Sequence, residues 1–163
     1  LRRPPAVNLS KVSSQTRAEL VAQLAERCWR AHYTSIIGGP QVDYMLSNFQ
    51  SSNAIVEQIA NGRDYYVIED DKPLGYLATD LKPDHLFLSK LYILPEFMGM
   101  GHGRWAIKEL AASHPGLPIH LTVNKHNHGT IAFYERLGFR KEGPVVADIG
   151  NGFFMDDWKM QRP

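Results

Sequence analysis

The spacing of apolar residues predicts helices in the first part of the chain and alternating strands and helices later. Between residues 20 and 32, apolar side chains recur at helical spacing, which predicts an amphipathic helix that runs to about Ser35. Thr16 and Glu19 form a capping-box pattern at its start. Beyond a break at residues 38–40, two shorter helices are expected at Gln41–Phe49 and Ser52–Ala60.

From residue 65 onward the pattern changes to short apolar runs bounded by turn residues, which is typical of strands. Helices are expected after the glycines at 99–103, with apolar residues on one face, and at Asn127–Leu137, where Gly138 is the expected stop. This order predicts one α/β domain over residues 1–163, of the α+β kind, with helices on both faces of a mixed sheet. The predicted strands are Ala6–Lys11, Tyr65–Glu69, Leu74–Asp80, His85–Leu94, Ile119–Val123, Phe139–Glu142, Val145–Ile149 and Phe153–Met160.

The segment that points to a chemistry is a strand end, Leu91–Pro95, followed by the glycine-rich turn Met98–Gly103 at the start of a helix. Unpaired backbone N–H groups and the helix dipole meet at such a point, and together they favour a bound phosphate. Glycines suit this role because a Cβ would hold the phosphate away from the backbone. The turn therefore predicts a phosphate-binding loop.

The loop lacks the features of the two commonest nucleotide-binding loops. A nucleoside triphosphate loop ends in Gly-Lys-Ser/Thr, whereas Gly103 is followed by Arg104-Trp105. A dinucleotide loop needs a third glycine two residues further and an acidic residue on the next strand. The next predicted strand begins Ile119-His120-Leu121-Thr122 and offers no acid.

The loop resembles instead the main signature of the GNAT superfamily of N-acetyltransferases, Gln/Arg-x-x-Gly-x-Gly/Ala after a strand that reads roughly Leu-Tyr-Val-x-Pro. Met98–Gly103 occupies the signature, with Met98 where the family usually has Gln or Arg. A second family signature resembles Asn127, Thr130 and Tyr134–Phe139, in the family's order and separation. The closing segment Asp148–Trp158 is similar to the PaiA-type branch of polyamine acetyltransferases.

The resemblance implies a GNAT-type fold, a mixed and mostly antiparallel sheet of about six to seven strands with helices on both faces. It implies acetyl-CoA as co-substrate, with the pyrophosphate on the backbone of Gly99–Arg104 and the pantetheine arm along Leu91 and Ile93. Tyr134 would protonate the leaving thiolate. The expected cofactor-binding residues are Leu91, Tyr92, Ile93, Met98, Gly99, Met100, Gly101, His102, Gly103, Arg104, Asn127 and Tyr134.

Several of these residues also have a plain structural interpretation, which the sequence leaves open. Leu91 and Ile93 suit the core side of a strand, and Arg104 suits an exposed helix position. Tyr134 lies three residues from Ile131 and from Leu137, which is the spacing of a core aromatic. Asn127 is also a good helix N-cap.

The attacking amine must lose a proton before it can use its lone pair, and no residue stands out as the base. Asp156 is the candidate acid of the site, because in strand phase it shares a face with Phe154, Trp158 and Met160. A carboxylate there would be a paired structural acid or would recognise a cationic amine. Asp148 is a weaker candidate, and Asp157 is expected to point the other way into solvent.

Charge and composition exclude other classes of function. The 18 basic and 17 acidic residues give a net charge of +1 and form no basic run, so a nucleic-acid partner is not expected. The chain has no apolar run of about 20 residues, so no membrane span is expected, and a cytoplasmic location follows by default. Cys28 falls in a helical pattern and suits a buried position, and His126 and His128 lack a third ligand for a metal.

These observations favour direct transfer of an acetyl group from acetyl-CoA to a primary amine in a ternary complex, without an acyl-enzyme. A polyamine-like small molecule is the first acceptor to test, and Trp29, Tyr33 and Tyr44 could form an aromatic wall beside it. Two alternatives stay open: a protein acetyltransferase acting on an N-terminus or a lysine, and a non-catalytic sensor of coenzyme A. The sequence also leaves open a homodimer.

Overall fold

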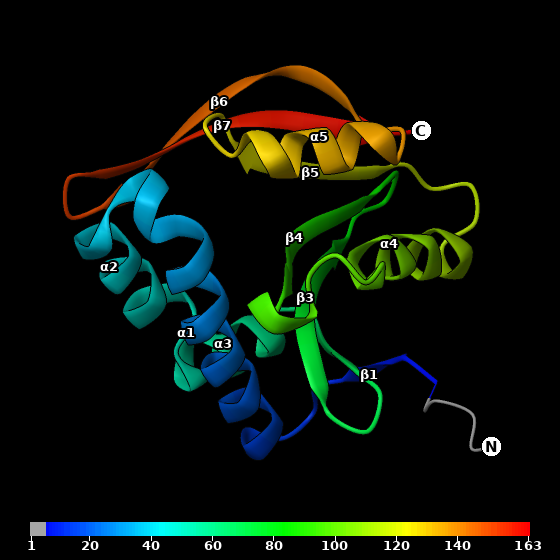
Figure 1. Ribbon diagram of the computed structural model, residues 1–163, viewed down its shortest axis with the longest axis horizontal. Coiled ribbons are helices and arrows are strands. Elements are labelled where there is room, and N and C mark those ends of the chain that lie inside the picture. The colour runs from blue at the N-terminus through cyan, green and yellow to red at the C-terminus, as the bar shows by residue number, and fades with distance from the viewer. Residues whose placement is uncertain (1–5) are drawn as a thin grey trace.

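The computed structural model describes residues 6–163, which form a seven-stranded sheet with helices on both faces (Figure 1). The sheet has the order β1-β2-β3-β4-β5-β7-β6, and every neighbouring pair is antiparallel except β4 and β5. The predicted mixed, mostly antiparallel sheet is therefore confirmed. The strands are β1 Asn8–Lys11, β2 Asp64–Glu69, β3 Pro73–Leu81, β4 Leu86–Ile93, β5 Ile119–Asn124, β6 Arg140–Gly150 and β7 Phe153–Arg162.

The helices begin and end close to the predicted positions, with one correction at the first cap. Ser14 is the N-cap of the first helix and accepts a hydrogen bond from the Arg17 amide at 3.2 Å, so the predicted capping box at Thr16 is wrong. Gly38, with φ 85°, ends that helix, and the next begins at once with Pro40 in its first turn. The helices are α1 Gln15–Ile37, α2 Gly39–Phe49, α3 Ser52–Ala60, α4 His102–Ser113 and α5 His128–Arg136, with a short 3-10 helix at Pro95–Phe97.

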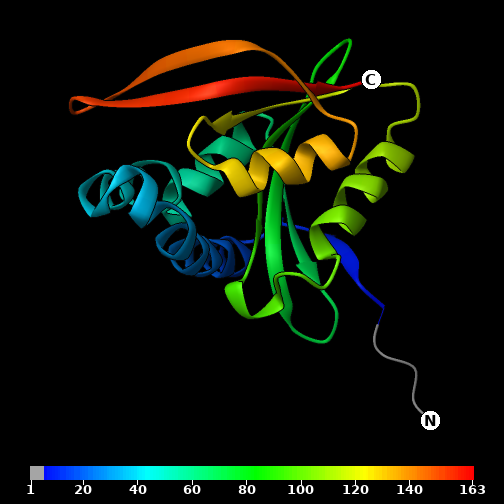
Figure 2. The ribbon, with the colours of Figure 1, turned by 45° about the horizontal axis from the view of Figure 1, so that its top comes forward.

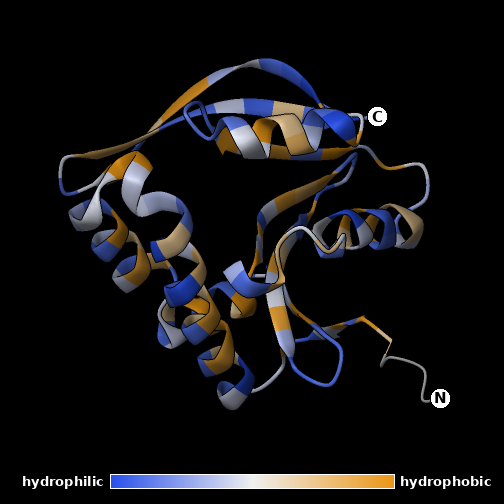
Figure 3. Cartoon of the chain, viewed as in Figure 1, coloured by the Kyte–Doolittle hydropathy of each residue, from blue (hydrophilic) through white to orange (hydrophobic). Residues whose placement is uncertain are grey.

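Two apolar cores lie on opposite faces of the sheet. One joins α1, α2 and α3 to buried side chains of β2 and β3, among them Tyr65 and Tyr76. The other joins α4 and α5 to the opposite face, where Leu86, Leu121 and Met160 are buried. Both views place α1–α3 and α4 on opposite sides of the central strands (Figures 1 and 2). The hydropathy colouring shows apolar and polar positions alternating around α1 (Figure 3), as its amphipathic pattern requires.

The last two strands form one long hairpin. The predicted strands Phe139–Glu142 and Val145–Ile149 are joined into the single strand β6, which a register shift between Lys141 and Gly143 keeps paired with β7. Phe139 itself is buried just before it. The hairpin extends past α2 (Figure 2), where the Tyr44 hydroxyl donates to the Ile149 carbonyl at 2.7 Å.

The sheet opens between its two parallel strands. Only Leu86 and Phe87 of β4 pair with β5, at Ile119 and His120, and beyond them the strands diverge. On its other edge β4 carries a bulge, since Lys90 pairs with Ala78 and Leu88 with Thr79, so Ser89 has no partner on β3. The later part of β4 therefore presents backbone groups to the opening.

Candidate functional site

The opening between β4 and β5 leads into a cavity of about 650 Å³. It brings together the diverging strands, the glycine loop, α5 and the end of α1 around Tyr33. Of the predicted cofactor-binding residues, only Met100 does not line it, and the Met100 side chain is 64% exposed. The predicted residues that line the cavity are Leu91, Tyr92, Ile93, Met98, Gly99, Gly101, His102, Gly103, Arg104, Asn127 and Tyr134.

The glycine loop ends in a helix N-terminus whose first amides are free. Gly101 is the N-cap of α4 in a left-handed conformation with φ 84°, and Gly99 also has a positive φ of 76°. The first backbone bond of the helix runs from the Trp105 amide to the Gly101 carbonyl at 2.9 Å. The amides of the three residues between them, 102–104, therefore have no helical partner and face a site suited to a phosphate.

Position 103 requires a glycine for a different reason, which is the close approach of α5. A Cβ built there would lie 3.1 Å from Cζ of Phe133 on α5. Gly103 therefore allows α4 to approach the Phe133 ring, whereas Gly99 and Gly101 permit the turn itself. Met98, where the signature that the loop resembles usually has Gln or Arg, is exposed and its side chain has no hydrogen-bond donor, so the donors of the loop are backbone groups.

Tyr134 is packed as a core aromatic and also lines the cavity. Its ring packs edge-on against Phe133 and Phe139, with 5.2 Å between ring centroids in each case, and the residue is only 7% exposed. Its hydroxyl has no hydrogen-bond partner among the described residues and is not one of the sealed polar atoms, so it opens to the cavity. Burial, with a smaller contribution from Tyr33, raises the pKa of Tyr134 well above its usual value. The phenol is therefore protonated at neutral pH.

Asn127 occupies the N-cap position of α5 but makes no side-chain cap hydrogen bond there. Asn127 lines the cavity, so its side chain is available to bind a ligand there. The turn before it is held instead by Asn124, which is buried and accepts the His126 amide at 2.9 Å on its side-chain oxygen. Sequence reasoning missed Asn124, although an Asn at a strand end is a common turn signal.

The two adjacent carboxylates on β7 differ from their predicted roles. The Asp156 side chain is 50% exposed and forms an ion pair with Lys125 at 2.9 Å, outside the cavity lining. The expectation that Asp157 is solvated is wrong, because it is 7% exposed. The predicted apolar face is also not a buried one throughout, since Phe154 is exposed. Helices cover both faces of the sheet along β7, so alternation alone could not decide which carboxylate is buried.

Of the three predicted wall aromatics, Tyr33 alone lines the cavity. Its hydroxyl lies 2.9 Å from the Tyr92 hydroxyl, and burial raises the pKa of Tyr33 to about 12. Trp29 belongs to the core, where its indole N–H donates to the Tyr76 hydroxyl at 2.9 Å. Tyr44 holds the β6–β7 hairpin instead.

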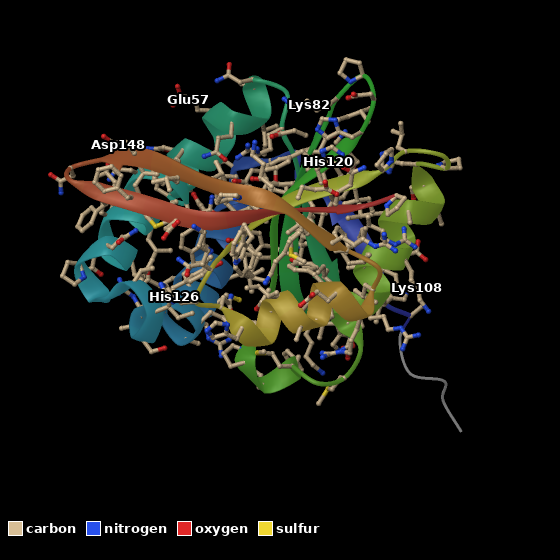
Figure 4. The ribbon with its side chains drawn as sticks, turned by 90° about the horizontal axis from the view of Figure 1, so that it is seen from above. Glu57, Lys82, Lys108, His120, His126 and Asp148 are labelled. Atoms are coloured by element: carbon tan, nitrogen blue, oxygen red, sulfur yellow. The ribbon has the colours of Figure 1, made fainter. Side chains whose placement is uncertain are left out.

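A second cavity of about 550 Å³ adjoins the first between α4 and α5. It shares Arg104, Phe133 and Arg136 with the first and is also lined by Lys108 and Arg162. None of its four cations forms an ion pair with a described carboxylate. Seen from above, Lys108 and Asp148 lie at opposite ends of the molecule (Figure 4). Sequence reasoning missed this basic groove, because its residues come from distant segments.

The cysteine and the histidine pair are the other residues that could carry chemistry. Cys28 is fully buried in α1, and burial raises the pKa of its thiol to about 12, so it is not a nucleophile at neutral pH. The rings of His126 and His128 lie 6.5 Å apart, and residues 6–163 contain no cluster of three or more metal-ligating side chains. No helix in the described range has the length and apolar composition of a bilayer span.

Several solved structures share this architecture. The crystal structure of the PaiA N-acetyltransferase from Thermoplasma acidophilum in complex with coenzyme A superimposes with a TM-score of 0.76 at 17% identity, over 96% of this chain and 98% of that one. An acetyltransferase from Thermus thermophilus gives 0.70 at 21% identity, over 97% of each chain. A mutant of the spermidine N-acetyltransferase SpeG from Vibrio cholerae superimposes with a TM-score of 0.65 at 20% identity, over 95% of this chain and 92% of that one. These similarities show the fold.

The sequence also matches known proteins directly. The peptidyl-lysine N-acetyltransferases YjaB of Salmonella typhimurium and Escherichia coli are 30% and 31% identical to it over 88 residues, or 53% of this chain. The match covers 57% and 56% of those relatives, little more than half of their length. The model of the acetyltransferase (GNAT) family matches residues 19–139, which carry the glycine loop, the diverging strands and Tyr134. The chain therefore belongs to the GNAT family of acetyltransferases.

Proposed function

We propose that this protein transfers the acetyl group of acetyl-CoA directly to a primary amine. The observation that carries the proposal is the continuity of three features in one cavity: free amides at the start of α4, unpaired backbone along β4, and the protonated phenol of Tyr134. The match to the GNAT family model and the PaiA complex with coenzyme A support acetyl-CoA as the acetyl donor.

The residues present suit coenzyme A along its length. The amides of 102–104 and the dipole of α4 would hold the pyrophosphate. The edge of β4 that β5 leaves free, from Ser89 to Ile93, would pair with the amides of the pantetheine arm as an added strand does. The basic groove with Arg104, Lys108 and Arg136 would receive the phosphorylated nucleotide end.

Bound acetyl-CoA supplies a thioester that an amine can attack without a covalent enzyme intermediate. Tyr134 stands in the cavity with its proton held by a raised pKa, which is the state that an acid needs before it protonates a departing thiolate. Cys28 is buried away from the cavity lining, which agrees with direct transfer.

For the acceptor, we propose a small primary amine with a polyamine as the first candidate. The structural neighbour SpeG, which is named a spermidine N-acetyltransferase, supports this class. Asp156, half-exposed beside Lys125, is proposed to attract a cationic acceptor from the rim, although its ion pair already offsets part of its charge. The alternative acceptor is a peptide lysine, which the YjaB relatives support.

The test is release of coenzyme A thiol from acetyl-CoA with a panel that contains spermidine, spermine, a monoamine, and peptides offering a lysine or a free N-terminus. We expect turnover with at least one amine. Substitution Tyr134→Phe should lower kcat by about 100-fold or more, the usual scale for loss of general acid catalysis. Calorimetry should show unchanged binding of acetyl-CoA to this variant.

Tyr66→Phe is a matched control, because Tyr66 is a half-buried tyrosine on β2 outside the cavity lining, and its hydroxyl has no described hydrogen bond. It should keep full activity. If the protein binds acetyl-CoA but releases no coenzyme A thiol with any amine of the panel, it is instead a sensor of coenzyme A.

A further inference from the structure

We propose that Asp157 accepts the proton that the acceptor amine loses during transfer. The proposal rests on the proposed acetyl transfer and deepens it, since Tyr134 provides an acid but the reaction also needs a base. Three features of the structure support it: the place of Asp157 beside the cavity wall, a buried oxygen without a partner, and the chemistry of its neighbours.

Asp157 lies on β7 directly opposite Asn124 of β5. Thr122 is two residues before Asn124 and therefore points to the same face of the sheet, and Thr122 lines the main cavity. Tyr33, which lines the cavity from α1, is close enough for the charge of Asp157 to raise its pKa. Asp157 thus lies next to Thr122 and within electrostatic reach of Tyr33, two residues that line the cavity.

The Asp157 carboxylate is poorly satisfied for a buried acid. The residue is 7% exposed, and its Oδ1 is sealed from solvent without a hydrogen-bond partner among the described residues. A structural acid at such a place is expected to have its oxygens paired, because an unpaired buried oxygen is costly. Arg63 and Asp80 show the paired arrangement nearby, with two bonds of 2.9 and 2.8 Å. Oδ1 therefore keeps lone pairs that are free to accept a proton.

Charged groups face Asp157 from each neighbouring element. Lys90 on β4, Lys125 after β5, Asp156 on β7 and Tyr33 on α1 all lie within electrostatic reach. Burial raises the pKa of Asp157 to about 6, while the Thr122 hydroxyl and the two lysines act in the opposite direction. Burial lowers the pKa of Lys90 to about 8, so this lysine remains mostly protonated at neutral pH. At neutral pH Asp157 is ionised and able to take a proton.

With Asp157 as base and Tyr134 as acid, each proton that moves during the transfer has a donor and an acceptor. A neutral amine attacks with its nitrogen lone pair, the C–N bond forms, and the C–S bond breaks with its electron pair on sulfur. The nitrogen, made acidic by the new bond, gives one proton to Asp157, and sulfur receives one from Tyr134. Asp157 must later release its proton and Tyr134 must regain one, through the cavity or through solvent.

The substitution Asp157→Asn removes the proton acceptor and keeps the size of the side chain. We expect kcat to fall by about 100-fold or more, within the usual range for a general base, with unchanged affinity for acetyl-CoA. Asp71→Asn is the matched control, because Asp71 lies in the β2–β3 turn with its side chain 66% exposed. A higher KM with unchanged kcat would overturn the proposal, because it would show that Asp157 only anchors the ammonium group.

The pH dependence gives a second test that needs no variant. A base must be deprotonated to act, so log(kcat/KM) should rise with slope two below a pH of about 6 and with slope one from there up to the pKa of the amine. An acceptor with a less basic amine should move the upper break and leave the lower break in place. In Asp157→Asn the lower break should vanish.

A wild-type profile with slope one throughout, or a lower break that follows the acceptor, would refute the role of Asp157 while leaving acetyl transfer intact. Failure of the proposed function looks different, because the wild-type protein would then release no thiol with any amine at any pH.

Discussion

Gly101 and Gly116 are both glycines in a left-handed conformation, and only one of them belongs to the cofactor loop. Gly101 begins α4 with φ 84°, and Gly116 lies in the turn after α4 with φ 81°. A Cβ added at either position meets nothing within 4 Å. The substitutions Gly101→Ala and Gly116→Ala therefore impose the same backbone strain without a clash, and only the first changes the surface that faces the proposed pyrophosphate.

The two variants should lose similar stability. A non-glycine residue in the left-handed region costs roughly 1–2 kcal/mol. For a chain of this size, that cost corresponds to a decrease in Tm of roughly 2–8 °C. Acetyl-CoA affinity should separate them, because strain relief at Gly101 tilts the first amides of α4 and displaces the phosphate. Loss of one hydrogen bond to a charged group costs about 1.5–3 kcal/mol, which is a factor of roughly 10–150 in Kd.

Calorimetric titration with acetyl-CoA, at a temperature where both variants are folded, measures the difference directly. We expect wild-type affinity for Gly116→Ala and affinity weakened by at least about tenfold for Gly101→Ala. Equal affinity in the two variants would refute the assignment of the phosphate to this helix start. Weakening in both would show that strain, and not ligand contact, controls binding.

Three further predictions concern other parts of the molecule. Arg136→Gln should weaken binding of coenzyme A more than binding of 3′-dephospho-coenzyme A, as measured by calorimetry, because Arg136 lines the basic groove. Tyr76→Phe should lower the free energy of unfolding in urea by about 1–3 kcal/mol, because the buried indole N–H of Trp29 loses its acceptor. The Arg63 guanidinium lowers the pKa of Asp80, so the advantage of wild type over Asp80→Asn in urea titrations should be present at neutral pH, begin to shrink near the ordinary carboxyl value of about 3.9, and be lost as the pH falls through the lowered pKa.

The sequence was sufficient for the elements and for the loop, because both depend on local chemistry. The spacing of apolar residues in α1 and the glycines before α4 act over a few neighbours, and the helices and strands lie close to their predicted bounds. The first helix cap was predicted at Thr16 and lies at Ser14, because both are good cap residues and only the backbone conformation distinguishes them.

The proposed base and the basic groove depend on contacts between distant segments, and the sequence did not predict either of them. Strand alternation on β7 favoured Asp156, but Asp157 is the buried carboxylate and lies within electrostatic reach of Tyr33 on α1, which is more than a hundred residues away in the chain. The basic groove likewise joins Arg104 to Arg136 and Arg162. Neither arrangement has a local pattern, so neither could be predicted before the packing of the helices was known.

The divergence of β4 from β5 gives these separate features one physical cause. Continued pairing past Phe87 and His120 would satisfy the backbone of β4 and close the cavity. Because pairing stops there, β4 keeps backbone donors and acceptors for an extended ligand. The β4 side chains on one face reach the core with α5, while Lys90 and Tyr92 face α1. Tyr134 lines this opening from α5, and Asp157 lies behind it on the other face of the sheet, near the lining residue Thr122. A thioester held along β4 would then have the proposed acid on one face of the sheet and the proposed base on the other.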